Sequence, residues 1–169
     1  MPELCHSPDA ATKITLRSAR PADEAFLYQV YAGTRQEELA LVDWDEERRE
    51  AFLRQQFTAQ HRWYYEQYTD TTFDVVLADG APIGRLYVAR WPDEIRIVDI
   101  ALLPEHRRRG IGSALLAQLL NGADRSGLRT TIHVERFNPA RRLYDRLGFV
   151  PVAETAPYLF MERPACAHW

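Results

Sequence analysis

The order of hydrophobic and polar residues changes along the chain between a two-residue period and a helical one. A two-residue period is typical of strands with one buried face, whereas apolar residues three and four positions apart predict a helix. Strands are predicted over residues 13–17, 72–78, 82–90, 95–103, 129–134, 149–154 and 158–163. Helices are predicted over residues 19–31, 45–67, 110–120 and 138–147, with Gly33 and Thr34 interrupting the chain after the first of them.

The sequence of these elements indicates the fold class. Asp79-Gly80 is a typical hairpin turn, so the three strands between residues 72 and 103 are expected to pair in order as a meander. A helix separates the strands at 95–103 and 129–134, which favours parallel pairing between them. We therefore expect one α/β (α+β) domain over residues 1–169, in which helices flank a central mixed, mostly antiparallel sheet. A loose leader is expected over residues 1–11 and a tail over 164–169.

The stretch from Glu94 to Leu120 has the pattern of an anion-binding element. Its strand runs through a turn, Pro104 to Arg109, into a helix that opens with Gly110-Ile111-Gly112-Ser113. The first N–H groups of a helix have no partner within it, and its dipole adds positive charge there, so a phosphate is favoured. The two glycines allow a close approach of the backbone, and three arginines (Arg107, Arg108 and Arg109) add positive charge.

Three kinds of anion-binding loop compete for this stretch. A nucleotide P-loop requires Lys-Ser or Lys-Thr after its last glycine, where this chain has Ser113-Ala114. A dinucleotide loop requires Gly or Ala in place of Leu115 and an acid at the end of the next strand. In the third reading, Arg107-x-x-Gly110-x-Gly112 resembles the acyl-CoA pyrophosphate loop of the GCN5-related N-acetyltransferases (GNAT family). The plain alternative is an exposed arginine-rich turn at an ordinary helix start.

A second motif supports the GNAT resemblance. The segment from Asn138 to Phe149 has Asn, then Ala140, then Leu143-Tyr144 and finally Gly148-Phe149. This order resembles the other signature of the same family, and the intervening strand lies where the family has one. The resemblance covers nearly the whole chain and leaves out only the leader and the tail after Arg163.

The resemblance implies a GNAT acyl-CoA N-acyltransferase fold, in which the parallel strand pair splays apart at a bulge, and acetyl-CoA as co-substrate. In the family, main-chain amides and a hydroxyl of the loop bind the CoA pyrophosphate, and pantetheine pairs with the first splayed strand. The cofactor-binding residues implied for this chain are Ile100, Ala101, Leu102, Arg107, Arg108, Arg109, Gly110, Ile111, Gly112, Ser113, Asn138 and Tyr144.

The same resemblance implies roles for Leu102 and Tyr144 in the chemistry. An amide near Leu102 would polarise the thioester carbonyl, and Tyr144 stands where many members have a general acid near the CoA sulfur. Because a thiol has a pKa of about 8.5, the leaving thiolate needs little help and the contribution of Tyr144 is expected to be limited. Packing of the Tyr144 ring on the sheet is the alternative.

Removing a proton from the acceptor amine is more demanding than protonating the leaving thiolate. An alkyl amine has a pKa of about 10.4 and is mostly protonated at neutral pH, so a group must take its proton. Asp99 interrupts an otherwise apolar strand, and family members that act on cationic amines often carry an acid at this point. Asp99 is therefore the first candidate for base or amine anchor, with an ion pair to a nearby Arg as the alternative. The fallback candidates are Glu94, His133 and Glu135.

The resemblance places the acceptor cleft between residues 33–50 and the hairpin loop at 152–158. Trp44 and Tyr158 are the aromatic residues expected near the acceptor. The first segment is acidic, which would attract a cationic amine. A solvated helix face is the alternative for Glu37, Glu38, Asp43, Asp45, Glu46 and Glu47.

The net charge and the residue composition limit the partners that this protein is expected to bind. The net charge of −3 argues against nucleic acid, and no apolar run reaches the roughly 20 residues of a membrane span. Cys5 and Cys166 lie near the two ends and are expected to be reduced thiols of a cytoplasmic protein, with a terminal disulfide as the alternative. The five histidines lack metal-ligand spacing, so no metal is predicted. A homodimer is compatible with the sequence.

These observations predict an acetyl-CoA-dependent N-acetyltransferase that acts on a primary amine of a small molecule or peptide through a ternary complex. One alternative is a non-catalytic CoA-binding module of the same fold. Another is an acyltransferase that uses a different acyl-CoA or a hydroxyl acceptor, because the fold alone does not determine function.

Overall fold

In the computed structural model, the described part of the chain, residues 11–166, forms one sheet of seven strands in the order β1-β2-β3-β4-β5-β7-β6. β4 and β5 pair in parallel, and the other neighbours pair antiparallel. The strands are β1 Ile14–Ser18, β2 Thr71–Ala78, β3 Ala81–Arg90, β4 Glu94–Leu102, β5 Arg129–Glu135, β6 Val150–Thr155 and β7 Tyr158–Arg163. Every predicted strand is therefore confirmed to within one residue at each end, and the predicted mixed sheet is confirmed.

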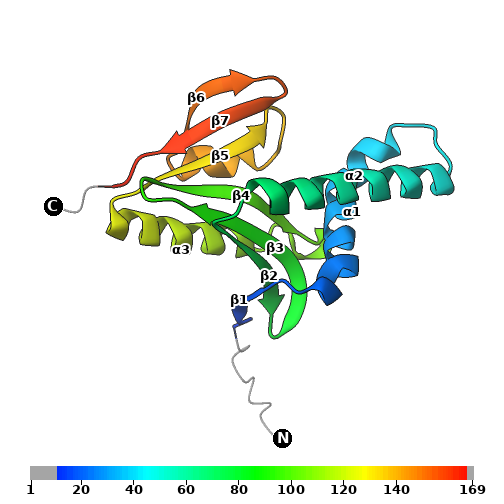
Figure 1. Ribbon diagram of the computed structural model, residues 1–169, viewed down its shortest axis with the longest axis horizontal. Coiled ribbons are helices and arrows are strands. Elements are labelled where there is room, and N and C mark those ends of the chain that lie inside the picture. The colour runs from blue at the N-terminus through cyan, green and yellow to red at the C-terminus, as the bar shows by residue number, and fades with distance from the viewer. Residues whose placement is uncertain (1–10, 167–169) are drawn as a thin grey trace, which may run out of the picture.

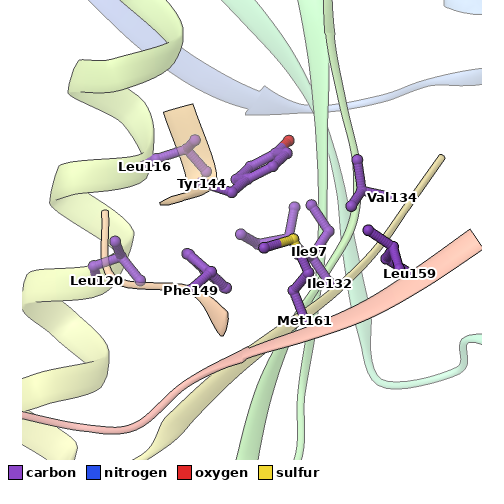
Figure 2. Close-up of a cluster of buried hydrophobic side chains, with 9 residues drawn as sticks. All are labelled: Ile97, Leu116, Leu120, Ile132, Val134, Tyr144, Phe149, Leu159 and Met161. Carbon is purple, nitrogen blue, oxygen red and sulfur yellow. The ribbon is translucent and has the colours of Figure 1, made fainter. Parts of the chain in front are cut away.

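Helices cover both faces of this sheet (Figure 1). On one face, α3 packs against apolar side chains of β4 and β5, among them Ile97 and Ile132, and α4 adds Tyr144 (Figure 2). On the other face, α1 and α2 pack through Leu27 and Phe57 against Val75 of β2. The helices are α1 Glu24–Ala40, α2 Glu46–Gln67, α3 Ile111–Ser126 and α4 Arg141–Arg146, with short 3-10 turns η1 Pro21–Asp23 and η2 Pro104–His106.

Three helix predictions are wrong in extent, and one of them, 110–120, is too short because α3 continues to Ser126. Gly33 does not interrupt the chain, because α1 continues through it to Ala40. A Cβ atom at Gly33 would lie 3.1 Å from Cδ of Pro104, so the glycine allows η2 to pack closely against α1. The last helix is shorter than 138–147, because the amide of Ala140 donates to Oδ1 of Asn138 in a turn before α4 begins. Most of the expected leader, including Cys5, and part of the expected tail lie outside the described residues.

The closed end of the β4–β5 pair is held by ion pairs. Glu94 is 6% exposed and accepts from Arg96 at 2.7 Å, from Arg129 at 3.0 Å and from the Thr131 hydroxyl. Burial opposes the charge of this carboxylate, but the hydrogen bonds from Thr131 and Arg96 hold its pKa below the usual value. This arrangement fixes the two strands together at the end where both begin.

Candidate active site

β4 and β5 separate after their first residues. Their parallel register runs from Glu94 with Arg129 to Ile97 with Ile132, and then ends, although β4 continues to Leu102 and β5 to Glu135. Figure 1 shows the two strands diverging. The register between β3 and β4 shifts at the same level, which leaves Val98 as an extra residue in a bulge. Because a bulge bends a strand, it accounts for the splay that the family resemblance implied.

The splay leaves one edge of β4 without a strand partner among the described residues. In an antiparallel pair, successive residues turn their N–H and C=O groups alternately toward and away from the partner strand. The amide of Leu103 donates to the carbonyl of Ile83, so Ala101 also faces β3, while the main-chain groups of Ile100 and Leu102 face the β5 side. The carbonyl of Leu102 accepts from Nε of Arg107 at 3.0 Å, which ties the following loop to the strand end.

The loop after β4 presents a row of amides that are free to bind an anion. Arg108 and Gly110 have left-handed backbone angles, with φ of 59° and 78°. Within residues 11–166, the amides from Arg108 to Ser113 donate to no protein acceptor, and the helical pattern starts when Ala114 donates to Gly110. Successive N–H groups around a left-handed residue form a concave nest for anions. The loop is not covered by side chains, because residues 107–110 are exposed and a Cβ atom at Gly112 would meet open space.

The bulge also decides which face Asp99 occupies. Ile95, Ile97 and Ile100 all pack on the α3 side of the sheet. The alternation of side chains between the two faces of the sheet therefore shifts by one residue between Ile97 and Ile100. This shift turns Asp99 to the α2 side, where its Oδ2 accepts from Arg85 Nη2 at 2.7 Å and from the Tyr64 hydroxyl at 3.0 Å. Bulges next to functional sites commonly re-aim a side chain in this way.

The groups around Asp99 are buried polar residues that sequence reasoning did not assign to the site. Arg85 of β3 is 2% exposed and also donates to Oε1 of Gln60 at 3.1 Å. Burial opposes its charge, but Asp99, together with Tyr87 and Tyr64, outweighs this effect and raises the pKa of Arg85. Burial and the nearby charge of Asp99 likewise raise the pKa of Tyr64. The sequence feature that could have pointed to these residues is Arg85, a charged residue in the middle of an apolar strand next to the strand of Asp99.

Tyr144 lies on the α3 side, at the same level as the splay. Its ring is 4% exposed and contacts the Phe149 ring edge-on at 5.8 Å between centroids. Figure 2 shows the phenol oxygen pointing away from Phe149, Leu120 and Met161. Burial raises the pKa of Tyr144, and the charge of Asp99 adds to this effect, so the hydroxyl keeps its proton. The residue therefore both packs in the core and presents a protonated phenol.

A basic pocket of about 470 Å³ lies before and along α4. Nε of Arg141 is buried and has no protein partner within the described residues, and Phe137 is 92% exposed. Neither residue was singled out from the sequence, although the Arg141-Arg142 pair beside the Asn138 motif was a usable signal. The pocket is lined by Arg136, Phe137, Asn138, Pro139, Arg141, Arg142 and Asp145.

The two aromatic residues expected near the acceptor have different surroundings in the structure. Tyr158 begins β7, is 43% exposed and pairs with Glu135 at the open end of β5. Trp44 instead packs locally, with its ring 5.3 Å from that of Phe52 and 4.5 Å from the guanidinium carbon of Arg48. Within residues 11–166, no hydrogen bond, ion pair or ring contact joins Trp44 to Tyr158 or Asp99.

The acidic segment before α2 has mainly a solvated and capping role. All six of its acids are exposed, and Asp45 caps α2 by accepting from the Arg48 amide at 2.8 Å. Glu38 pairs with Arg35, which also reaches Glu135 at 3.5 Å and so links α1 to the end of β5. The solvated-face alternative therefore describes this segment better than a continuous acidic wall.

Two of the fallback candidates, Glu94 and His133, make structural contacts of their own. Glu94 belongs to the closed end of the β4–β5 pair, where it holds that end together. The His133 ring lies 4.7 Å from that of Phe160, and burial, together with Arg96, lowers its pKa. Residues 11–166 contain no cluster of three or more metal-ligating side chains and no helix long and apolar enough to cross a membrane.

Comparisons with known proteins find the same fold in other chains. The structure is similar to the PaiA N-acetyltransferase of Thermoplasma acidophilum in complex with coenzyme A, with a TM-score of 0.68 and 19% identity over 90% of this chain and 99% of that one. It is also similar to the ribosomal-protein-S18-alanine N-acetyltransferase of Escherichia coli, with a TM-score of 0.62 and 20% identity over 93% and 97% of the two chains. An acetyltransferase from Thermus thermophilus gives a TM-score of 0.63 and 22% identity over 89% and 96%.

At these identities the structural likeness shows the fold. No curated protein matches the sequence. The model of the acetyltransferase (GNAT) family matches residues 38–149, which is more than half of the chain and includes the β4 edge, the amide loop and α4. The chain therefore belongs to the GNAT acetyltransferase family.

Proposed function

We propose that this protein is an acetyl-CoA-dependent N-acetyltransferase that acetylates a primary amine of a small molecule or peptide by direct attack in a ternary complex. The observation that carries the proposal is the open edge of β4 at Ile100 and Leu102, which leads directly into the amides of residues 108–113, unpaired within the described chain. An extended thioester arm can pair with the strand edge while a diphosphate accepts from the amides. The similar PaiA enzyme, which binds coenzyme A, supports this reading.

The described residues fit acetyl-CoA in three places. The amides from Arg108 to Ser113 and the Ser113 hydroxyl would bind the diphosphate, with Arg108 and Arg109 exposed beside them. Pantetheine would run along residues 100–102, and Asn138 would hold the turn that follows β5. The basic pocket at Arg141 and Arg142 suits the phosphate of the nucleotide end.

The chain's own groups supply the chemistry around the thioester, which is an activated acyl donor. The Leu102 amide would donate to the carbonyl oxygen as negative charge develops there. Asp99, on the α2 side, would accept a proton from the attacking amine, and Tyr144, on the α3 side, would give one to the departing thiolate. Because the amine on the α2 side would be held against a thioester at the β4 edge, much of the rate enhancement comes from positioning the two reactants.

Tyr144→Phe is expected to lower kcat by a limited factor, about tenfold, while acetyl-CoA affinity stays within about twofold. The phenol oxygen is removed but the buried ring and its contact with Phe149 remain, so the core is preserved. Steady-state kinetics and calorimetric titration measure the two quantities. A variant with wild-type kcat would reduce Tyr144 to a packing residue, and one that no longer binds acetyl-CoA would give it a binding role instead.

A combined assay tests the proposed function. Calorimetric titration with acetyl-CoA is expected to show binding, and thiol release over a panel of primary amines is expected to exceed release without amine. Binding without amine-dependent release would indicate the CoA-binding module. Faster release with a longer acyl-CoA, or with a hydroxyl acceptor, would indicate the other acyltransferase class.

A further inference from the structure

A chain of hydrogen bonds joins α2 to the candidate base. Gln60 and Tyr64 lie one turn apart on α2, and both reach the sheet. Arg85 of β3 donates from Nη2 to Gln60 at 3.1 Å and to Asp99 at 2.7 Å, and Tyr64 donates to Asp99 at 3.0 Å. We call the residues Gln60, Tyr64, Arg85 and Asp99 the α2–β4 network.

Both donors in the α2–β4 network reach the same carboxylate oxygen. Oδ2 of Asp99 accepts from Arg85 and from Tyr64, whereas Oδ1 accepts from no group within residues 11–166. Charge-assisted hydrogen bonds are short and strongly directional, so two of them fix the rotation of the carboxylate. One oxygen is therefore held by the protein, and the other keeps its lone pairs for a donor from outside.

The donors are themselves held rigidly. The Arg85 side chain is 3% exposed, and a buried guanidinium needs its carboxylate partner, so Arg85 stays with Asp99. The Tyr64 ring meets the Tyr87 ring edge-on, at 5.9 Å between centroids and 90° between planes.

The charge of Asp99 also reaches Tyr144 on the opposite side of β4, since it contributes to the raised pKa of that phenol. Asp99 therefore lies within electrostatic range of the proposed acid.

We propose that Tyr64, supported by Arg85 and Gln60, is a positioning residue that orients Asp99 so that Oδ1 accepts a hydrogen bond, and then the proton, from the acceptor amine. This proposal rests on the proposed function. In the step concerned, the amine nitrogen bonds to the acetyl carbon and the carbon–sulfur bond breaks. One proton of the nitrogen passes to Oδ1, the thiolate takes a proton from Tyr144, and exchange with solvent then returns Asp99 and Tyr144 to their starting protonation states. A purely structural ion pair is the alternative, because buried pairs of this kind also occur away from active sites.

A double-mutant cycle with Tyr64→Phe and Asp99→Asn distinguishes these roles. If Tyr64 acts through Asp99, Tyr64→Phe lowers kcat by about tenfold in the wild-type protein and causes no further loss in Asp99→Asn. Acetyl-CoA affinity is expected to stay unchanged in all variants. Equal proportional losses in both backgrounds, or wild-type kcat in Tyr64→Phe, would overturn the proposal.

The neighbouring residue provides a matched control. Tyr65 is 44% exposed and its ring stacks on Phe73, 4.0 Å between centroids, so Tyr65→Phe keeps the stack and leaves the network intact. This variant is expected to retain wild-type kcat. Melting curves of each variant separate a loss of folded protein from a loss of rate. Failure of the wild-type protein to acetylate any amine would overturn the proposed function and this proposal together. If the wild-type protein acetylates an amine but the effects of Tyr64→Phe and Asp99→Asn on kcat are independent of each other, only the positioning role is overturned.

Discussion

Gly112→Asp is expected to abolish measurable acetyl-CoA binding, which we take as a loss of at least about a hundredfold in affinity. A Cβ atom at residue 112 would point into open space, so the new side chain should not prevent folding. Its carboxylate would lie among the free amides at the start of α3, where it would accept their hydrogen bonds and repel a diphosphate. Calorimetric titration with acetyl-CoA measures the loss.

Gly122→Asp is the matched control for this prediction. Gly122 lies on the same helix, and a Cβ atom there also meets open space, but its amide is inside the helix and away from the loop. The control is expected to bind acetyl-CoA as the wild type does, after correction for any change in melting temperature. Unchanged affinity in Gly112→Asp would show that the loop does not bind the diphosphate.

Asp99→Asn is expected to lower kcat for amine acetylation by about a hundredfold or more, with acetyl-CoA affinity unchanged. The substitution keeps the size of the side chain but removes the carboxylate that would take the amine proton. It also leaves the buried Arg85 charge without its partner, so a lower melting temperature is expected and kinetics should be measured well below it.

Asp74→Asn serves as the control for Asp99→Asn. Asp74 is a half-buried carboxylate of β2 that pairs in register with Ser18 and Leu86, away from the splayed strands. This variant is expected to keep wild-type kcat. A rise in the amine KM of Asp99→Asn at constant kcat would make Asp99 an anchor and not a base, and unchanged kinetics would remove it from the site.

Local patterns were sufficient to predict most elements, because short strands, the Asp79-Gly80 turn and a glycine-bearing helix start are encoded by neighbouring residues. The amide loop was predictable for the same reason. Gly33 misled the reading of α1, because the property that weakens a helix in isolation is the one that allows Pro104 to pack against it. That contact joins residues far apart in sequence, and periodicity does not reveal it.

The surroundings of Asp99 depend on features that the sequence does not display. Simple alternation would place Asp99 on the same face as Ile95 and Ile97, and only the bulge at Val98 turns it toward α2. Its donors come from two other elements, so the network forms only when α2 packs on the sheet. The surroundings of Trp44 are local by contrast, because its ring packs on Phe52 a few residues along the chain, and its place near the acceptor stays a prediction.

Hydrogen exchange of individual amides, followed by NMR with and without acetyl-CoA, tests the central claim most directly. Binding is expected to slow exchange at residues 108–113 and at Ile100 and Leu102, because these N–H groups lack an acceptor within residues 11–166 and face the loop or the open edge. Amides of the closed end at Glu94 to Ile97 should change little. Binding of acetyl-CoA that leaves exchange at residues 100–113 unchanged would contradict the assignment of the loop and the strand edge as its site.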